Sequence, residues 1–70
     1  MSQWPATKAR QVLAALERLG WQVARTRGSH RLLVRLGWRP YLFAYHDNEE
    51  IGPKALARLA RLTGLEPGDL

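Results

Sequence analysis

The spacing of apolar residues changes twice along this chain of 70 residues, and these changes constrain the fold more than any other feature. From Thr7 to Leu19, apolar side chains recur every three or four residues, which predicts an amphipathic helix. Between residues 21 and 47 they recur every second residue, which predicts strands. Helical spacing returns from Pro53 to Leu62. The sequence therefore predicts the element order αβββα.

Turn and cap residues mark the ends of these elements. Thr7 is a candidate N-cap for the first helix, and Gly20 follows where a left-handed C-cap belongs. Short breaks at residues 28–29 and 37–40 separate three strands and predict an antiparallel meander. The second helix is expected to begin at Pro53. A third strand is expected over residues 41–46, and the C-terminal tail from residue 66 is expected to fray.

Together these signals predict one α+β domain over residues 1–70. We expect a three-stranded antiparallel sheet with two helices packed on one face, because both helices need the same apolar surface. The second strand carries Arg31 and Arg35 on one face, and we expect this face to be the exposed one. Of the three tryptophans, Trp38 is the one expected to be exposed, since it lies in a turn.

The charge distribution favours a polyanionic partner. Eleven Lys and Arg against six Asp and Glu give a net charge of +5. Residues 1–46 hold eight of the cations and one acid, whereas residues 47–70 hold three cations and five acids. Nine of the cations are Arg, whose guanidinium group forms bidentate contacts with phosphate. Nucleic acid is a candidate partner, although many small proteins are basic without binding it.

Several classes of protein are excluded by composition. The chain has no Cys, which excludes a disulfide framework and a Cys-based zinc site. No apolar run approaches the about twenty residues that a membrane span needs, and no signal-peptide pattern opens the chain. We therefore expect a cytoplasmic domain, no membrane partner, and no metal or other cofactor.

Two histidines are candidates for acid–base chemistry, because imidazole ordinarily exchanges protons near neutral pH. His30 opens the second predicted strand, and arginines flank it on both sides. Gly28, just before Ser29, allows a ligand to approach the backbone closely. Neighbouring guanidinium groups could bind a phosphodiester and stabilise charge that accumulates in the transition state. The alternative is a surface histidine that only hydrogen-bonds in the turn.

His46 ends the third predicted strand and precedes Asp47. If strand pairing brought it close to His30, the two imidazoles would form an acid–base pair of the ribonuclease type. The register of the strands is not readable from the sequence. A strand-end histidine that pairs with Asp47 or caps the turn is therefore the favoured interpretation.

Basic residues recur at the spacing of strand faces. Arg25 with Arg27, and Arg31 with Arg35, are each placed to share one face of neighbouring strands, which predicts a patch rather than scattered charges. Lysines at the starts of the two helices could extend this patch. The candidate RNA-binding residues are Lys8, Arg25, Arg27, Arg31, Arg35 and Lys54.

The chain resembles the HicA-type toxins of bacterial toxin–antitoxin systems from about residue 7 to residue 65. The resemblance rests, in order, on Leu-Glu-Arg-Leu-Gly-Trp at 16–21, Arg-Thr-Arg-Gly-Ser-His at 25–30, a strand that ends at His46, and Glu-Ile-Gly at 50–52 before a helix that runs into Thr-Gly-Leu at 63–65. The Gly-Ser-His sequence between two short strands is the most specific of these features.

The resemblance implies a fold like that of double-stranded-RNA-binding domains, in agreement with the predicted order. It implies metal-independent cleavage of mRNA, with an essential histidine that corresponds to His30, and a HicB-type antitoxin that masks the site. The family often has a second histidine directly after the catalytic one, where this chain has Arg31. It often has Pro two residues before the later histidine, where this chain has Ala44. The first departure concerns the surroundings of the active site.

The leading hypothesis is therefore an endoribonuclease toxin in which His30 acts as general base on a 2′-hydroxyl. Arg25, Arg27 and Arg31 would stabilise the transition state, and Gly28, Ser29 and His46 are possible supporting residues. One alternative is a non-catalytic RNA-binding module of the same fold. Another is a protein-interaction module that binds an acidic partner through a helical stripe formed by Lys54, Arg58 and Arg61.

Overall fold

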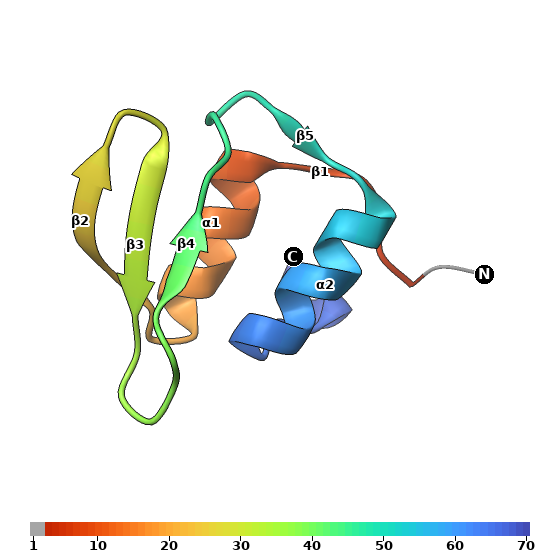
Figure 1. Cartoon of the computed structure of the whole chain (residues 1–70). Coiled ribbons are helices and arrows are strands. Elements are labelled where there is room, and N and C mark those ends of the chain that lie inside the picture. Colours follow the sequence, from red (N-terminus) through yellow and green to blue (C-terminus); the bar gives the residue numbers. More distant parts are fainter. Residues whose placement is uncertain (1–2) are drawn as a thin grey trace.

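A three-stranded sheet and two helices form the body of the fold (Figure 1). The computed structural model describes residues 3–70, so the first two residues of the predicted domain lie outside the described residues. The elements in chain order are β1 (Thr7–Lys8), α1 (Ala9–Arg18), β2 (Gln22–Arg27), β3 (His30–Val34), β4 (Tyr41–Phe43), β5 (Glu50–Ile51), α2 (Pro53–Thr63) and the 3₁₀ turn η1 (Pro67–Asp69). The predicted α+β class and the antiparallel three-stranded sheet are confirmed.

The strands β2, β3 and β4 pair in chain order as an antiparallel meander. Gly28 and Ser29 form the two-residue turn of the first hairpin, which places Arg27 directly opposite His30. Gly28 has a φ of +60°, which suits the first central position of a type II′ turn. Because this position favours glycine, the Gly-Ser sequence fixes the register of the hairpin at the end where His30 lies.

A bulge in β2 reverses which residues of that strand point to each face of the sheet. The register shifts between Val23 and Arg25, so that Val23 lies opposite Leu33 whereas Arg25 lies opposite Leu32. Residues directly opposite each other share a face of the sheet, and Leu32 and Leu33 are on opposite faces. Val23 and Arg25 would share a face in a regular strand, but here the bulge places Arg25 on the other side.

The expectation that the Arg-bearing face of the second strand is exposed is wrong. Leu33 lies between Arg31 and Arg35 on that face and is fully buried. Leucines occur on both faces of β3, so this strand alone does not determine which side is covered. Phe43, which is also fully buried and lies opposite Arg31, selects the core side. The exposed face of β3 is therefore the one that carries His30.

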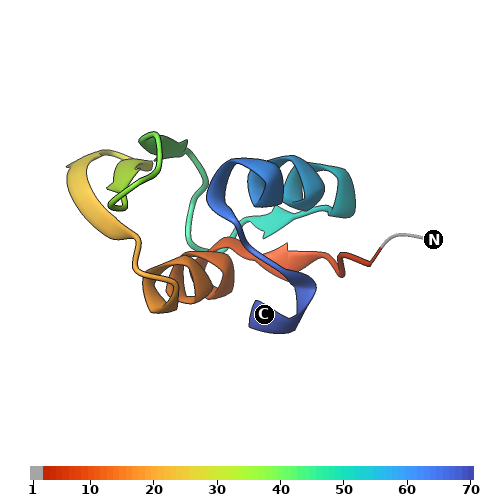
Figure 2. The same cartoon turned by 90° about the horizontal axis from the view of Figure 1, so that it is seen from below.

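Both helices contribute to one core. Helix α1 lies behind the sheet, and α2 stands beside β4 (Figures 1 and 2). The buried cluster draws on both helices, the sheet, β5 and the segments beside them. Its members are Ala9, Val12, Ala15, Leu16, Trp21, Leu33, Phe43, Ile51, Leu56, Leu59 and Leu65. No helix within residues 3–70 is long and apolar enough to cross a membrane.

The prediction that Thr7 caps α1 is wrong. Thr7 lies in β1, which pairs antiparallel with β5, and its hydroxyl donates a hydrogen bond to the carbonyl of Pro5 at 2.7 Å. The first two amide groups of α1 instead donate to carbonyls of the loop 46–49. Ala9 N–H bonds to Glu49 O at 2.8 Å, and Arg10 N–H bonds to Asp47 O at 3.1 Å. Backbone carbonyls thus satisfy donors that a side-chain cap would otherwise serve.

Strand β4 is shorter than predicted for a related reason. It ends at Phe43, and the chain then leaves the sheet to reach the start of α1. His46 therefore lies in a loop rather than in a strand. The predicted fraying of the tail is also not observed, because η1 forms there. Arg18 Nη2 donates to the carbonyl of Asp69 at 2.9 Å and attaches this turn to α1.

The end of α2 is fixed by two tryptophans. Trp21 Nε1–H donates to the buried carbonyl of Thr63 at 3.1 Å. Gly64 is the left-handed C-cap, with a φ of +78°, and the ring of Trp38 lies against it. Trp38 is 41% exposed, more than the other two tryptophans, as predicted. The tryptophan rings meet edge to face at a centroid distance of 6.0 Å.

Gly64→Ala is expected to lower the free energy of unfolding by about 2 kcal/mol, because its Cβ would combine backbone strain with a clash. An added Cβ would lie 2.7 Å from Cη2 of Trp38. Urea denaturation followed by far-UV circular dichroism measures the loss. Gly68→Ala is the matched control, since nothing lies within 4 Å of its Cβ position and its φ is not left-handed. Equal stability of the two variants would contradict the expected packing.

Candidate functional site

Three of the predicted site residues gather on the outer face of the sheet. Arg27 lies directly opposite His30, and Arg25 lies opposite Leu32 one row further along. All three polar side chains are exposed. Together with Leu32 and Leu42 they line one shallow hollow with a volume of about 250 Å³. This arrangement places two guanidinium groups beside an imidazole on an open surface, which suits a phosphodiester.

The local sequence produces this arrangement in two ways. The two-residue turn makes Arg27 the direct partner of His30. The bulge at Ala24 lets Val23 lie on the core side, opposite the buried Leu33, while Arg25 lies on the outer face. Because the turn pairs Arg27 with His30, strand alternation alone places both arginines on the outer face. Without the bulge, Val23 would share that face with them, so the bulge keeps an apolar side chain out of the basic face.

His46 lies close to the same turn but belongs to a different hollow. That hollow is lined by Gly28, Ser29, Arg31, Tyr45, His46, Asp47 and Asn48. His46 N–H donates to Oε1 of Glu49 at 3.1 Å, and its carbonyl accepts from Glu49 N–H at 2.9 Å. The backbone of His46 thus helps to form the turn whose carbonyls cap α1. The two histidines do not line a common hollow, so no acid–base pair is assembled in the hollow of His30.

Arg31 is directed away from His30, because neighbours in a strand point to opposite faces. Its Nη2 forms an ion pair with Oδ1 of Asp47 at 3.0 Å. Its Nη1 is buried and has no hydrogen-bond partner among residues 3–70. Since Asp47 also accepts the amide of Arg10 through its carbonyl, the ion pair connects β3 to the start of α1. This connection supports the strand of His30 from behind.

The remaining predicted cations are dispersed. The guanidinium of Arg35 lies over the ring of Trp38, 5.3 Å from its centroid, in a cation–π contact. Lys8 Nζ donates to the carbonyl of Asn48 at 3.2 Å and so holds the loop before β5. Neither residue lines the hollow of His30. The four-arginine patch expected on the sheet is thus divided between its two faces.

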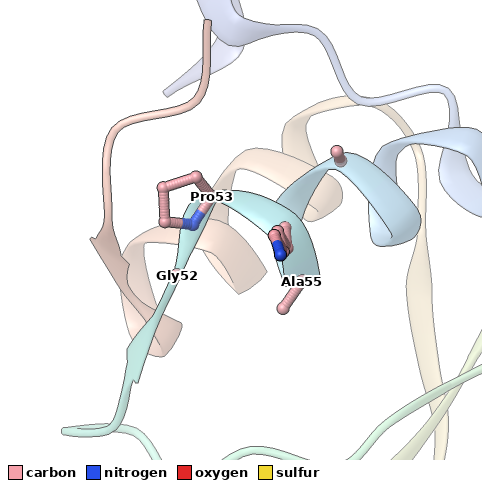
Figure 3. A pocket seen from close by; sticks show the side chains of 5 residues that line it. Gly52, Pro53 and Ala55 are labelled. Atoms are coloured by element: carbon pink, nitrogen blue, oxygen red, sulfur yellow. The ribbon is translucent and has the colours of Figure 1, made fainter. Parts of the chain in front are cut away.

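Lys54 lies at the start of α2, beside a hollow that is far from the β2–β3 hairpin (Figures 1 and 3). Apart from Lys54, the lining is apolar or backbone. It consists of Gly52, Pro53, Ala55 and Ala57. This hollow lacks the imidazole and guanidinium groups of the sheet face, so it does not offer comparable chemistry toward phosphate.

Tyr41 is a further titratable group near the sheet, but it is not a candidate base. Burial raises the pKa of Tyr41 to about 12, and the neighbouring phenol of Tyr45 raises it as well. Tyr41 lies opposite Leu33 and is therefore on the core side. Within residues 3–70, no group of three or more His, Cys, Asp or Glu side chains is arranged to hold a metal ion.

The apolar part of the hollow and the ion pair were not predicted from the sequence. Alternation along the strands was the available signal for Leu32 and Leu42, because it places neighbouring side chains on opposite faces of the sheet. Asp47 was considered only as a partner of His46. The available signal was that Asp47 is the first acid after a series of six arginines between residues 18 and 39.

These features define the class of the protein as a small α+β domain with a basic, histidine-containing sheet face. Residues 9–65 match the family model of the HicA toxin of bacterial toxin–antitoxin systems. Because this match covers most of the chain, the protein belongs to the HicA toxin family. A comparison with curated proteins finds no match. The family resemblance stated above is confirmed, and a toxin–antitoxin partnership follows from it.

Asp47→Asn is expected to lower the free energy of unfolding by about 1 kcal/mol, because the guanidinium of Arg31 loses its charged partner. The asparagine retains the backbone carbonyl that caps α1. A double-mutant cycle measures the interaction: thermal or urea denaturation compares wild type, Asp47→Asn, Arg31→Gln and the double variant. Glu17→Gln, at an exposed position of α1, is the control for loss of one negative charge. Fully additive losses would contradict a direct interaction between the two side chains.

Proposed function

We propose that the protein is an endoribonuclease toxin that cleaves mRNA at the outer face of its sheet, with His30 as general base. The observation that carries this proposal is the pairing of His30 with Arg27, with Arg25 in the same exposed hollow. An imidazole can act as the general base on a 2′-hydroxyl, and two guanidinium groups can stabilise the charge on the phosphate.

In the proposed reaction, His30 removes the proton from a ribose 2′-hydroxyl. The 2′-oxygen attacks the adjacent phosphorus, a new P–O bond forms, and the bond from phosphorus to the 5′-oxygen breaks. The leaving oxygen takes a proton from solvent, since His46 lines a separate hollow. The products are a 2′,3′-cyclic phosphate and a 5′-hydroxyl, and no metal ion takes part.

Arg25 and Arg27 would bind the non-bridging phosphate oxygens and stabilise the charge that grows on them in the transition state. Arg31 was expected to share this role, but its position favours another. It faces away from His30 and pairs with Asp47, so it would act by supporting the strand. The departure from the family pattern at Arg31 therefore changes the back of the sheet and leaves the reacting face intact.

Two partners belong to this proposal. The first is mRNA, which the basic face of a protein with net charge +5 would attract. The second is an antitoxin of the HicB type, which would inhibit the enzyme by covering the outer face of the sheet. Both partners and the toxin would meet in the cytoplasm.

His30→Ala is expected to reduce cleavage by at least about 100-fold, which is the usual contribution of a general base. A defined, structured RNA is incubated with purified protein in EDTA, and the products are separated by gel electrophoresis and analysed for their end groups. RNA affinity should change by less than about twofold, because the phosphate contacts come from the two arginines. His46→Ala is the matched control and should retain cleavage.

Three results would contradict the proposal: unchanged cleavage by His30→Ala, loss of wild-type cleavage in EDTA, or a product with a 5′-phosphate. If wild type and His30→Ala bind RNA equally and neither cleaves it, the protein is a non-catalytic RNA-binding module. That alternative would rest on the same basic face, since Arg25 and Arg27 can bind phosphate without the imidazole.

A further inference from the structure

The proposed reaction uses only part of the hollow on the outer sheet face. Leu32 and Leu42 lie directly opposite each other and form its apolar part. Leu42 is 53% exposed and lies in the same row of the outer sheet face as Arg25 and Leu32. A lone exposed leucine needs no explanation, but this pair is contiguous and borders the residues that would bind phosphate.

The register places His30 and both leucines in two neighbouring rows, each of which ends in an arginine. One row consists of Arg27 and His30, and the next consists of Arg25, Leu32 and Leu42. The rows are two residues apart along β3, which corresponds to about 7 Å. A nucleotide has the same division, with an anionic phosphate at one end and an apolar base face at the other. A phosphate bound in the first row would therefore direct a base toward the second.

We propose that the pair Leu32–Leu42 is the floor on which one unpaired nucleobase lies beside the scissile phosphate. The inference rests on the proposed function and specifies its substrate as single-stranded RNA. Arg25 ends the same row, so a guanidinium that would bind the phosphate lies directly beside this floor. Bases within a duplex are stacked and paired, so their faces cannot reach a sheet surface.

Charge favours a nucleobase over an apolar protein segment as the occupant. The same hollow holds Arg25 and Arg27, and no acidic side chain lines it. A ligand that fills the hollow must therefore contain an anionic group and an apolar face that are separated by about 7 Å, the distance spanned by two residues of a strand. Leu42 then contributes to specificity by contacting the base, and it does not take part in proton transfer.

The test measures binding of a short, unstructured RNA in which 2′-deoxy substitution prevents cleavage, by fluorescence anisotropy. Leu42→Ser is expected to raise Kd about tenfold, the scale of one base contact on an apolar surface. Leu62→Ser is the matched control, because Leu62 is 54% exposed on α2, outside the hollow, and should change Kd by less than twofold. Circular dichroism confirms that both variants fold.

An abasic oligomer of equal length separates base contacts from phosphate contacts, since it keeps every phosphate. Wild type and Leu62→Ser should prefer the base-containing RNA about tenfold, and Leu42→Ser should lose most of this preference. A duplex of the same sequence should bind wild type more weakly than the single strand. An unchanged preference in Leu42→Ser, or tighter binding of the duplex, would overturn the inference.

The outcomes distinguish this inference from the proposed function. Cleavage that depends on His30 without any effect of Leu42 on binding would refute the nucleobase floor alone. A base preference that depends on Leu42, in a protein that cleaves no RNA, would support the floor and refute the endoribonuclease. If Leu42→Ser changes only self-association in sedimentation, the apolar pair is a contact between copies of the chain and the inference fails.

Discussion

The face of the sheet that carries Leu33 is covered by the core. This burial determines which side chains of β3 are exposed to solvent, because only the opposite face remains open. Phe43, in the neighbouring strand, is buried on the same side and covers the core together with Leu33. His30 lies three residues before Leu33, so the alternation of a strand directs it outward. The two-residue turn pairs Arg27 with His30, and strand alternation places Arg25 on the same side. The basic face is thus a consequence of core packing combined with the register of one hairpin.

The back of the sheet is attached to the first helix by a short loop. Asp47 has two roles there, since its carboxylate pairs with Arg31 while its carbonyl accepts the amide of Arg10. The carbonyl of Glu49 accepts the amide of Ala9 in the same way. The start of α1 therefore depends on the loop that follows β4. This linkage positions the strand of His30 relative to the helix without using a residue of the exposed face.

The sequence was sufficient for the elements that have strong local signals. Helical spacing that begins at Pro53 predicted α2, and Gly28 with Ser29 predicted the turn before His30. The sequence did not indicate which face of β2 and of β3 is buried, because leucines occur on both sides of β3 and nothing at Ala24 indicates a bulge. The cap of α1 comes from carbonyls about forty residues away in the chain, and backbone groups leave no signature in a sequence.

In the proposed function, RNA binds to the outer face of the sheet. Amide chemical-shift changes in an NMR titration of the isotope-labelled protein with a 2′-deoxy-substituted RNA test it most directly. The largest changes are expected at Arg25, Arg27, His30 and Leu42, which line one hollow. Changes concentrated at the helix starts near Lys8 and Lys54, with the sheet face unaffected, would contradict it.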